Sequence, residues 1–259
     1  MLVNKDDKFL KALLDTKDLK NSLYSILKHS FLYNSNKIEG STFTTEALAL
    51  LLDKNVVTGQ HTLDDVQETV NSSYVFDRIF ETVGEKIDHR FLKDLHARLM
   101  FNTTMHTRGF SGIYKTIPNM IIGTEAKVAQ PFEVESKLDE LIEWYYSLKD
   151  ITIDEISEFH YRFELIHPFQ DGNGRIGRFL MLKQMIENWM EVKIVSWDTE
   201  DLYRKALNLC GENNYSSLTK YLISLSDFKK EYEGFFGIYK KLRKVTLNFF
   251  SLHDHSKSK

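Results

Sequence analysis

Residues that cross-link or interrupt a chain are scarce in this sequence. Among 259 residues there are one cysteine, three prolines and twelve glycines. A single cysteine, Cys210, excludes an intramolecular disulfide and is typical of proteins in a reducing compartment. Few glycines and prolines favour helices over many short strands, because both residues punctuate strands and proline is excluded from helix interiors. We therefore expect an all-α fold.

The sequence also lacks a strong charge of either sign and a long apolar run. Its formal net charge is −3 and its pI about 6.3, which gives no electrostatic basis for binding nucleic acid. No apolar stretch approaches the ~20 residues that span a bilayer, and the first residues contain no signal-peptide core. We expect a cytoplasmic protein with no membrane partner and no direct nucleic-acid partner.

The organisation of the chain indicates one globular domain over residues 1–259. Hydrophobic residues make up 42% of the sequence, and no internal repeat or low-complexity linker divides it. Apolar residues keep helical spacing over residues 6–33, and the polar residues 34–36 are expected to end this first helical region. Further helices are expected at residues 45–52, 62–80, 88–101, 131–148, 152–166, 201–209, 215–225 and 232–250.

Turn-forming residues are concentrated in residues 108–131. There, two short β-branched segments at residues 121–122 and 127–128 flank the sequence Gly123-Thr124-Glu125. This pattern predicts a small β-hairpin. A hairpin in an otherwise helical chain is a candidate flap over a site.

Residues 167–178, with the sequence HPFQDGNGRIGR, contain the groups that a polyphosphate site needs. His167 is the only side chain among them that takes up a proton near neutral pH, so it is the candidate general base. Asp171 offers a carboxylate to a divalent cation, since magnesium prefers one or two carboxylates together with phosphate oxygens.

A Gly-Asn-Gly stretch at residues 172–174 follows and opens an apolar run. Helix N-termini bind phosphates, and glycines allow close approach of the backbone. Arg175 and Arg178 are three residues apart and share a face of the expected helix. Apolar residues then occupy most faces, which predicts a central buried helix. The alternative interpretation is a helix–turn–helix in which Asp171 and the Gly-Asn-Gly stretch only cap helices and the arginines are solvated.

These twelve residues resemble the signature of the Fic family, His-x-Phe-x-Asp/Glu-Gly-Asn-Gly-Arg-x-x-Arg, and agree with it at all eight specified positions. The resemblance implies a Fic fold, a helical bundle around the central helix, with an N-terminal region (residues 1–45), a Fic core (about 90–225) and a C-terminal helix and tail (226–259). It further implies a bacterial-type protein adenylyltransferase, which moves AMP from ATP to a Tyr, Ser or Thr hydroxyl of a protein target. The chain itself is among the candidate targets, and relatives with this layout often form homo-oligomers.

The resemblance also implies a role for each residue of the signature. His167 would deprotonate the target hydroxyl, and Asp171 would hold Mg²⁺, with Mn²⁺ also acceptable. Gly172, Asn173, Gly174, Arg175 and Arg178 would bind the phosphates, Tyr203 the nucleoside, and Ile121, Ile122 and Gly123 a target peptide by strand addition.

A second resemblance lies near the N-terminus. Ser35-Asn36-Lys37-Ile38-Glu39-Gly40 is similar to the inhibitory motif Ser/Thr-x-x-x-Glu-Gly/Asn of this family, in the class whose inhibitory helix precedes the core. It implies that Glu39 pairs with Arg178 and blocks productive binding of ATP, with Ser35 supporting the same arginine.

Three alternative functions stay open. Relatives that resemble the Doc toxins carry lysine at the position of Gly174 and transfer the γ-phosphoryl group, so glycine favours nucleotidyl transfer. Glu39 would instead serve AMP removal if it oriented a water molecule. A non-enzymatic ATP-sensing module would need only the nucleotide site.

Overall fold

The computed structural model describes residues 13–17, 19, 21–121, 126–211 and 214–228, and this part of the chain is helical. Its only β pairing is an isolated bridge between Gly211 and Asn214. The all-α prediction is confirmed. In chain order the elements are α2 (Leu23–Ile38), α3 (Thr45–Lys54), α4 (Leu63–Glu81), α5 (His89–Leu99), α6 (Thr104–Thr107), η1 (Pro131–Glu133), α7 (Val134–Ser147), α8 (Ile153–Ile166), α9 (Asn173–Glu187), η2 (Trp197–Thr199), α10 (Glu200–Asn208) and α11 (Ser216–Ser224).

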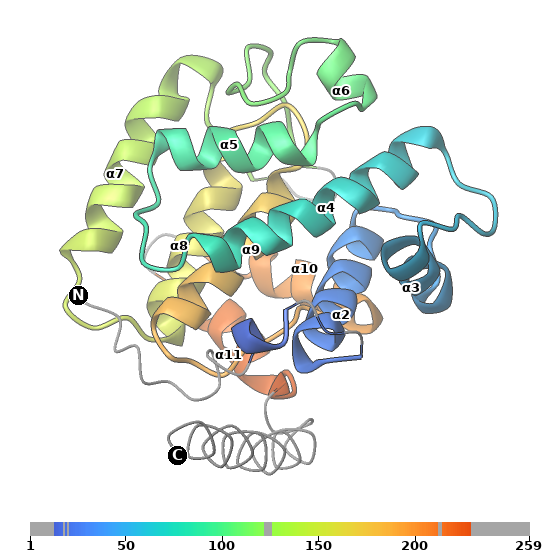
Figure 1. Cartoon of the computed structure of the whole chain (residues 1–259). Coiled ribbons are helices and arrows are strands. Elements are labelled where there is room, and N and C mark those ends of the chain that lie inside the picture. The colour runs from blue at the N-terminus through green and yellow to red at the C-terminus, as the bar shows by residue number, and fades with distance from the viewer. Residues whose placement is uncertain (1–12, 18, 20, 122–125, 212–213, 229–259) are drawn as a thin grey trace, which may run out of the picture.

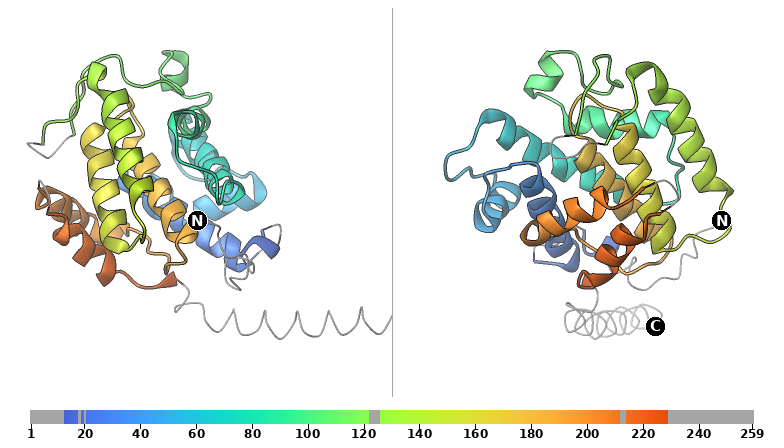
Figure 2. Two further views of the ribbon diagram at one scale, coloured as in Figure 1. Left: turned by 90° about the vertical axis from the view of Figure 1, so that its left-hand side faces the viewer. Right: turned by 180° about the vertical axis from the view of Figure 1, so that it is seen from behind.

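Helix α9 lies at the centre of the molecule (Figure 1). It contacts α8 on one side and α4 and α5 on the other, so that α7 and α8, then α9, then α4 and α5 form successive layers (Figure 2). Every residue from Arg175 to Ile186 is buried. The prediction of a central buried helix is confirmed, and the site at its first turn is held from several sides.

Aromatic side chains fill the space between α9 and the N-terminal helices. The ring of Phe31 on α2 lies 5.0 Å from that of Phe179 on α9 and 5.8 Å from that of Phe76 on α4. A second apolar cluster joins α9 to α10 and α11 and contains Met185 and Tyr203. None of the described helices combines the length and hydrophobicity needed to cross a bilayer.

Helix starts follow the capping signals in the sequence. Thr44, Thr62 and Asp88 each accept a hydrogen bond from a backbone N–H in the first turn of the helix that follows. Thr152 and Glu155 form the expected capping box at the start of α8.

The expected end of the first helical region was wrong. Described residues between 16 and 22 form turns, and α2 then continues through residues 34–36 to Ile38. The polar side chains stay helical because they have tertiary partners: the Trp197 N–H donates to Asn34 Oδ1 (2.8 Å), and the Ser72 hydroxyl donates to Asn36 Oδ1 (3.0 Å). Continuation of α2 to Ile38 places Glu39 at its C-cap.

The segment between α6 and η1 is irregular where it is described, yet it is tied to the loop before α9. The Lys115 N–H donates to Pro168 O (2.8 Å), and Asn119 Nδ2 donates to Phe169 O (2.9 Å). The predicted hairpin falls partly on residues 122–125, outside the described residues, and stays a prediction. The helix expected at 232–250 also lies outside them.

Replacing Phe179 by alanine should lower the free energy of unfolding by about 3 to 5 kcal/mol, because it opens a cavity in a core that cannot collapse around rigid helices. Urea denaturation would measure this loss. Phe132→Ala is the matched control, since Phe132 is 86% exposed and its truncation should change stability by less than about 0.5 kcal/mol. Equal losses in both variants would contradict the central position of α9.

Candidate active site

The loop between α8 and α9 is closed by its own residues. Helix α8 ends at His167 with φ 48°, and α9 starts after Gly172 with φ 77°. Asn173 fastens the loop, since its Oδ1 accepts from the Phe169 N–H (2.7 Å) and its Nδ2 donates to Phe169 O (2.8 Å). The Asn173 side chain is therefore engaged inside the loop, and its backbone N–H lies in the first turn of α9, where helix N–H groups have no intrahelical partner. The positive φ of Gly172 favours glycine, and a Cβ there would also press on the end of the Met100 side chain.

His96 on α5 supports the same loop and was missed by the sequence analysis, because no local motif surrounds it. Its ring stacks on Phe169 with centroids 3.9 Å apart. Its Nε2 lies 3.1 Å from Asp171 O, and its Nδ1 accepts from the Gly112 N–H (3.0 Å). Burial lowers the pKa of His96 to about 3, so the ring is neutral, with the proton on Nε2.

His167 is placed to act as a base. Its Nδ1–H donates to Glu164 O (3.2 Å), which leaves the lone pair on Nε2. Burial, assisted by the positive charge of Lys115, lowers the pKa of His167 to about 4. The imidazole is therefore neutral at physiological pH and able to accept a proton.

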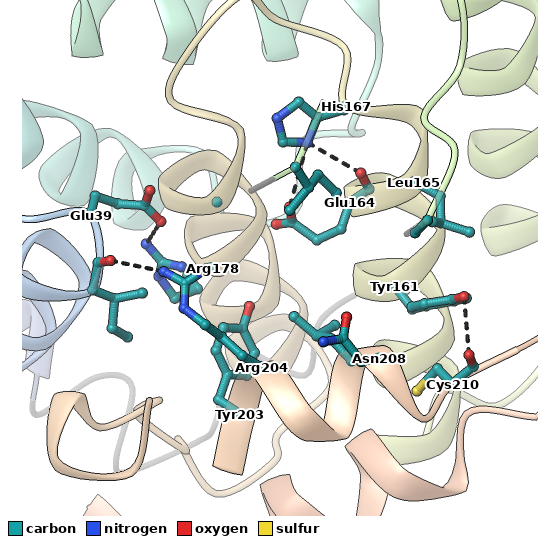
Figure 3. Close-up of a pocket in the computed structure, with 15 residues that line it drawn as sticks. Glu39, Tyr161, Glu164, Leu165, His167, Arg178, Tyr203, Arg204, Asn208 and Cys210 are labelled. Carbon is teal, nitrogen blue, oxygen red and sulfur yellow. Dashed lines mark hydrogen bonds and ion pairs between the residues drawn. The ribbon is translucent and has the colours of Figure 1, made fainter. Parts of the chain in front are cut away.

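His167 borders a cavity of about 820 Å³ (Figure 3). Gly174, Arg178 and Tyr203 line the same space, and Ile121 reaches it from the segment before η1. Ile122 and Gly123 lie outside the described residues. Lining residues that the sequence analysis did not single out include Tyr161, Glu164 and Leu165.

Tyr203 contributes to this cavity from a fixed position. It is 3% exposed, and its hydroxyl lies 2.6 Å from Nε2 of His160. The contact between a buried ring on α10 and a buried histidine on α8 holds the two helices together beneath the cavity. The Tyr203 side chain therefore lines the cavity and is also part of the core.

Arg178 is held by the end of α2. Its Nη2 donates to Glu39 Oε1 (2.7 Å) and to Ser35 O (2.9 Å), and its Nε donates to Ser35 Oγ (2.9 Å). Burial acts to raise the pKa of Glu39, but the charges of Arg178 and Arg175 outweigh it and lower that pKa. The pair is therefore ionised.

The Glu39 carboxylate lies directly over the first turn of α9. A Cβ on Gly174 would clash with Glu39 Oε1. The positive end of a helix is where an anion binds, so the carboxylate occupies the position that suits a phosphate. Gly40 follows with φ 91°, a conformation that favours glycine and turns the chain away from α2.

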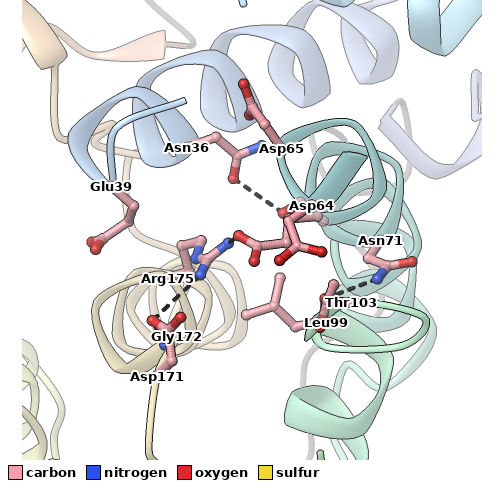
Figure 4. A network of polar contacts seen from close by, with 12 residues as sticks. Asn36, Glu39, Asp64, Asp65, Asn71, Leu99, Thr103, Asp171, Gly172 and Arg175 are labelled. Carbon is pink, nitrogen blue, oxygen red and sulfur yellow. Dashed lines mark hydrogen bonds and ion pairs between the residues drawn. The ribbon is translucent and has the colours of Figure 1, made fainter. Parts of the chain in front are cut away.

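A second cavity of about 280 Å³ contains Asp171 and Arg175 (Figure 4). Arg175 Nη1 pairs with Glu68 Oε2 from α4, and its Nη2 lies 3.7 Å from Asp171 Oδ1. Glu39 and Gly40 line this cavity too, so the Glu39 side chain borders both spaces. Glu68 was missed, since nothing in its local sequence points to a signature arginine 107 positions later.

Asp171 suits a hard cation. Its side chain is 44% exposed and lines the second cavity with Asp64, Asp65 and Glu68. Within the described residues no group of three potential ligands forms a closed metal site. A cation at Asp171 would therefore need oxygens from a bound phosphate to complete its coordination, as magnesium does in nucleotide sites.

Residues 86–185, from just before α5 almost to the end of α9, match the sequence profile described as the Fic/DOC family. The chain carries a Fic domain. The match includes the whole loop from His167 to Gly172 and the first turns of α9 that bear both arginines.

Proteins named as protein adenylyltransferases are also similar to this chain, at low sequence identity. The chain is 21% identical over 238 residues to the protein adenylyltransferase fic-1 of Caenorhabditis elegans, covering 86% of this chain and 46% of that protein. It is 36% identical over 78 residues to a probable protein adenylyltransferase of Aquifex aeolicus, covering 29% of this chain and 24% of that one. The chain thus spans about half the length of the fic-1 relative.

Solved structures show the same fold. A Fic-domain-containing signaling protein from Bacteroides thetaiotaomicron superposes with a TM-score of 0.74 at 22% identity, covering 90% of this chain and 97% of that one. A variant of Fic-1 from C. elegans gives a TM-score of 0.71 at 18% identity, covering 90% and 72%.

Replacing Lys115 by methionine should raise the pKa of His167 in this Fic domain, because it removes a nearby positive charge that opposes protonation. NMR titration of the imidazole between pH 3 and 8 would measure the shift. Lys93→Met is the control, since Lys93 lies over the Tyr114 ring and should leave the His167 titration unchanged. A downward shift on Lys115→Met would refute this account of the electrostatics.

Proposed function

We propose that this chain is a protein adenylyltransferase that moves AMP from ATP to a hydroxyl side chain of a protein target, and that Glu39 inhibits it. The observation that carries the proposal is that a neutral His167 and the N-terminus of α9 border one cavity. This places a base beside an anion-binding position. The relatives named as protein adenylyltransferases support the same activity.

The phosphates of ATP would lie against the first turn of α9. The backbone N–H groups of Gly172, Asn173 and Gly174 would receive phosphate oxygens, and Arg175 and Arg178 would neutralise their charge. Asp171 would hold Mg²⁺, or Mn²⁺, and the bound cation would offset phosphate charge.

The reaction follows from the position of Nε2 on His167. As the target hydroxyl oxygen forms a bond to the α-phosphorus, its proton passes to Nε2. The bond from the α-phosphorus to the bridging oxygen breaks, and pyrophosphate leaves with that electron pair. The proton then returns to solvent or to pyrophosphate, which restores the neutral ring.

The remaining walls suggest where the other groups bind. The nucleoside would extend toward Tyr203, and the target peptide would approach along Ile121, Ile122 and Gly123. The target class is a protein with an accessible Tyr, Ser or Thr hydroxyl, including a second copy of this chain in a homo-oligomer. We propose a bacterial-type enzyme acting in the cytoplasm.

Glu39 would inhibit in two ways. It holds Arg178, and its carboxylate lies where a phosphate would meet the N-terminus of α9. A polyphosphate would therefore lack the contact with Arg178 and would be repelled by the Glu39 carboxylate.

Replacing Glu39 by glycine should raise the fraction of protein that gains the mass of AMP roughly 10- to 100-fold, because a buried charge pair that competes with the phosphates is removed. Intact-mass measurement after incubation with ATP and Mg²⁺ tests this. Glu39→Gly combined with His167→Ala is the control and should gain nothing. A gain of one phosphate, or label transferred from the γ-phosphate and not from the α-phosphate, would instead establish Doc-like phosphoryl transfer. ATP binding without any mass change would favour an ATP-sensing module.

AMP removal is an alternative activity that the position of Glu39 also favours. The Glu39 carboxylate and His167 border the same cavity, so Glu39 could orient a water toward an AMP-bearing side chain. If so, Glu39→Gly should slow release of AMP from a modified target while it accelerates attachment. Release that is unaffected by the substitution would leave transfer as the sole activity.

Replacing Asp171 by asparagine in the Glu39→Gly background should lower AMP transfer at least about 100-fold, since the phosphates lose the cation that neutralises them. EDTA should lower AMP transfer by the Glu39→Gly protein to the same extent. Asp64→Asn is the matched control, because Asp64 lines the same cavity and its Oδ1 accepts from the Thr104 N–H (3.0 Å). Full activity of Asp171→Asn in EDTA would remove Asp171 as the cation ligand.

A further inference from the structure

Glu164 is a buried acid beside the candidate base, and the proposed reaction does not yet use it. It lies on α8, one turn before His167, and is 8% exposed. Its Oε2 is 3.9 Å from His167 Nδ1, and its side chain lines the 820 Å³ cavity (Figure 3). Its Oε1 accepts no hydrogen bond from the described residues.

Gly177 makes room for this carboxyl. A Cβ on Gly177 would come within 2.7 Å of Glu164 Oε1 and 3.1 Å of His160 Nδ1, so a side chain there would make the Glu164 carboxyl shift. His160 Nδ1 likewise has no hydrogen-bond partner among the described residues. Buried polar atoms without partners are costly, so a positive charge that forms beside Glu164 would be stabilised by its carboxylate.

We propose that Glu164 is a positioning residue for His167, whose carboxylate supplies the counter-charge for the imidazolium formed when His167 takes the proton of a target hydroxyl. This rests on the proposed function. The Nδ1–H bond to Glu164 O fixes the tautomer, so the incoming proton binds Nε2 and the new positive charge spreads over both nitrogens. The nearer of these to a carboxylate is Nδ1, which faces Glu164 Oε2.

Other carboxylates near His167 face arginines instead. Glu39 binds Arg178, and Asp171 lies 3.7 Å from Arg175. Lys115, on the segment before η1, adds a positive charge that opposes the imidazolium. A counter-charge is therefore needed, and Glu164 is the acid in direct reach of the ring.

The surroundings of Glu164 set when it is charged. Burial raises the pKa of Glu164 to about 7. The charge of Arg178 on α9 lowers this pKa, the charge of Glu39 raises it, and the charge of Arg204 on α10 lowers it. His160 on its own helix is neutral, because burial lowers its pKa to about 3. The carboxyl should thus ionise as pH rises through about 7, while His167, with its pKa near 4, stays neutral.

The pairing can be tested without nucleotide or target. Diethyl pyrocarbonate modifies neutral imidazoles, and trypsin releases residues 163–175, which contain His167 as their only histidine. Between pH 5.5 and 9 the rate of His167 modification should rise about fivefold through pH 7, because the carboxylate makes the ring more basic. Glu164→Gln should abolish the rise. Glu158→Gln, on the same helix and paired with Arg162 (3.2 Å), should retain it. An unchanged rise in Glu164→Gln overturns the proposal.

Steady-state kinetics in the Glu39→Gly background tests the role in the reaction. Glu164→Gln should lower kcat about tenfold, leave KM for ATP unchanged and remove the rise of kcat near pH 7. A change confined to KM, or an unchanged kcat, overturns the positioning role. If the Glu39→Gly protein makes no AMP product while modification of His167 still depends on Glu164, the pairing stands and the proposed function fails.

The glutamine variant should also remain folded. A carboxyl whose pKa is raised from 4.5 to about 7 in the folded state destabilises the protein increasingly between these two pH values and fully above pH 7, since the unfolded chain ionises first. Glu164→Gln removes this term, so its melting temperature should exceed that of the parent above pH 7. A lower melting temperature at every pH, with the modification rise lost, would assign Glu164 a structural role and overturn the proposal.

Discussion

The arrangement of the site depends on the burial of Arg178, which is 2% exposed in the middle of the molecule. A guanidinium removed from water must be paired and hydrogen-bonded, or the cost exceeds what a small domain can tolerate. Ser35 and Glu39 at the end of α2 meet that demand. The end of α2 is thus held to α9 by the same arginine that would bind a nucleotide under the proposed function, so the proposed inhibition would be part of the packing of the core.

Two residues hold Arg178: Ser35 is fixed within α2, whereas Glu39 can move away. Ser35 O and Oγ lie within α2, whose Phe31 packs on Phe179. Glu39 lies beyond the last helical residue, beside Gly40 with φ 91°, and its side chain is 31% exposed against 3% for Arg178. Rotation at the end of α2 would therefore free Arg178 toward a phosphate while two of its hydrogen bonds and the aromatic core persist. Under the proposed function, release of inhibition would therefore need no unfolding of α2.

Most of what the sequence revealed about this structure is local; the pairing of Glu39 with Arg178 was expected only from the family motif, and other tertiary contacts left no signal. Caps such as Thr44, Asp88 and Thr152 predict helix starts because their hydrogen bonds are made within four residues. The polar residues 34–36 predicted an end to the first helix, but Trp197 and Ser72, distant in sequence, bind their side chains and keep α2 intact. The pairing of Glu68 with Arg175 joins α4 to the signature across 107 residues. Contacts of this kind leave no periodicity or spacing that one sequence could reveal.

The two cavities explain why one carboxylate suffices to inhibit under the proposed function. The base His167 borders the larger cavity, whereas Asp171 and Arg175 border the smaller one. A nucleotide whose α-phosphorus is reached from His167, and whose phosphates share a cation with Asp171, must extend across both. Glu39 borders each cavity, and its carboxylate lies over Gly174, at the N-terminus of α9 between them. It thus blocks the path of the polyphosphate as well as binding Arg178, so a ligand that displaced it from the arginine alone would still meet its charge.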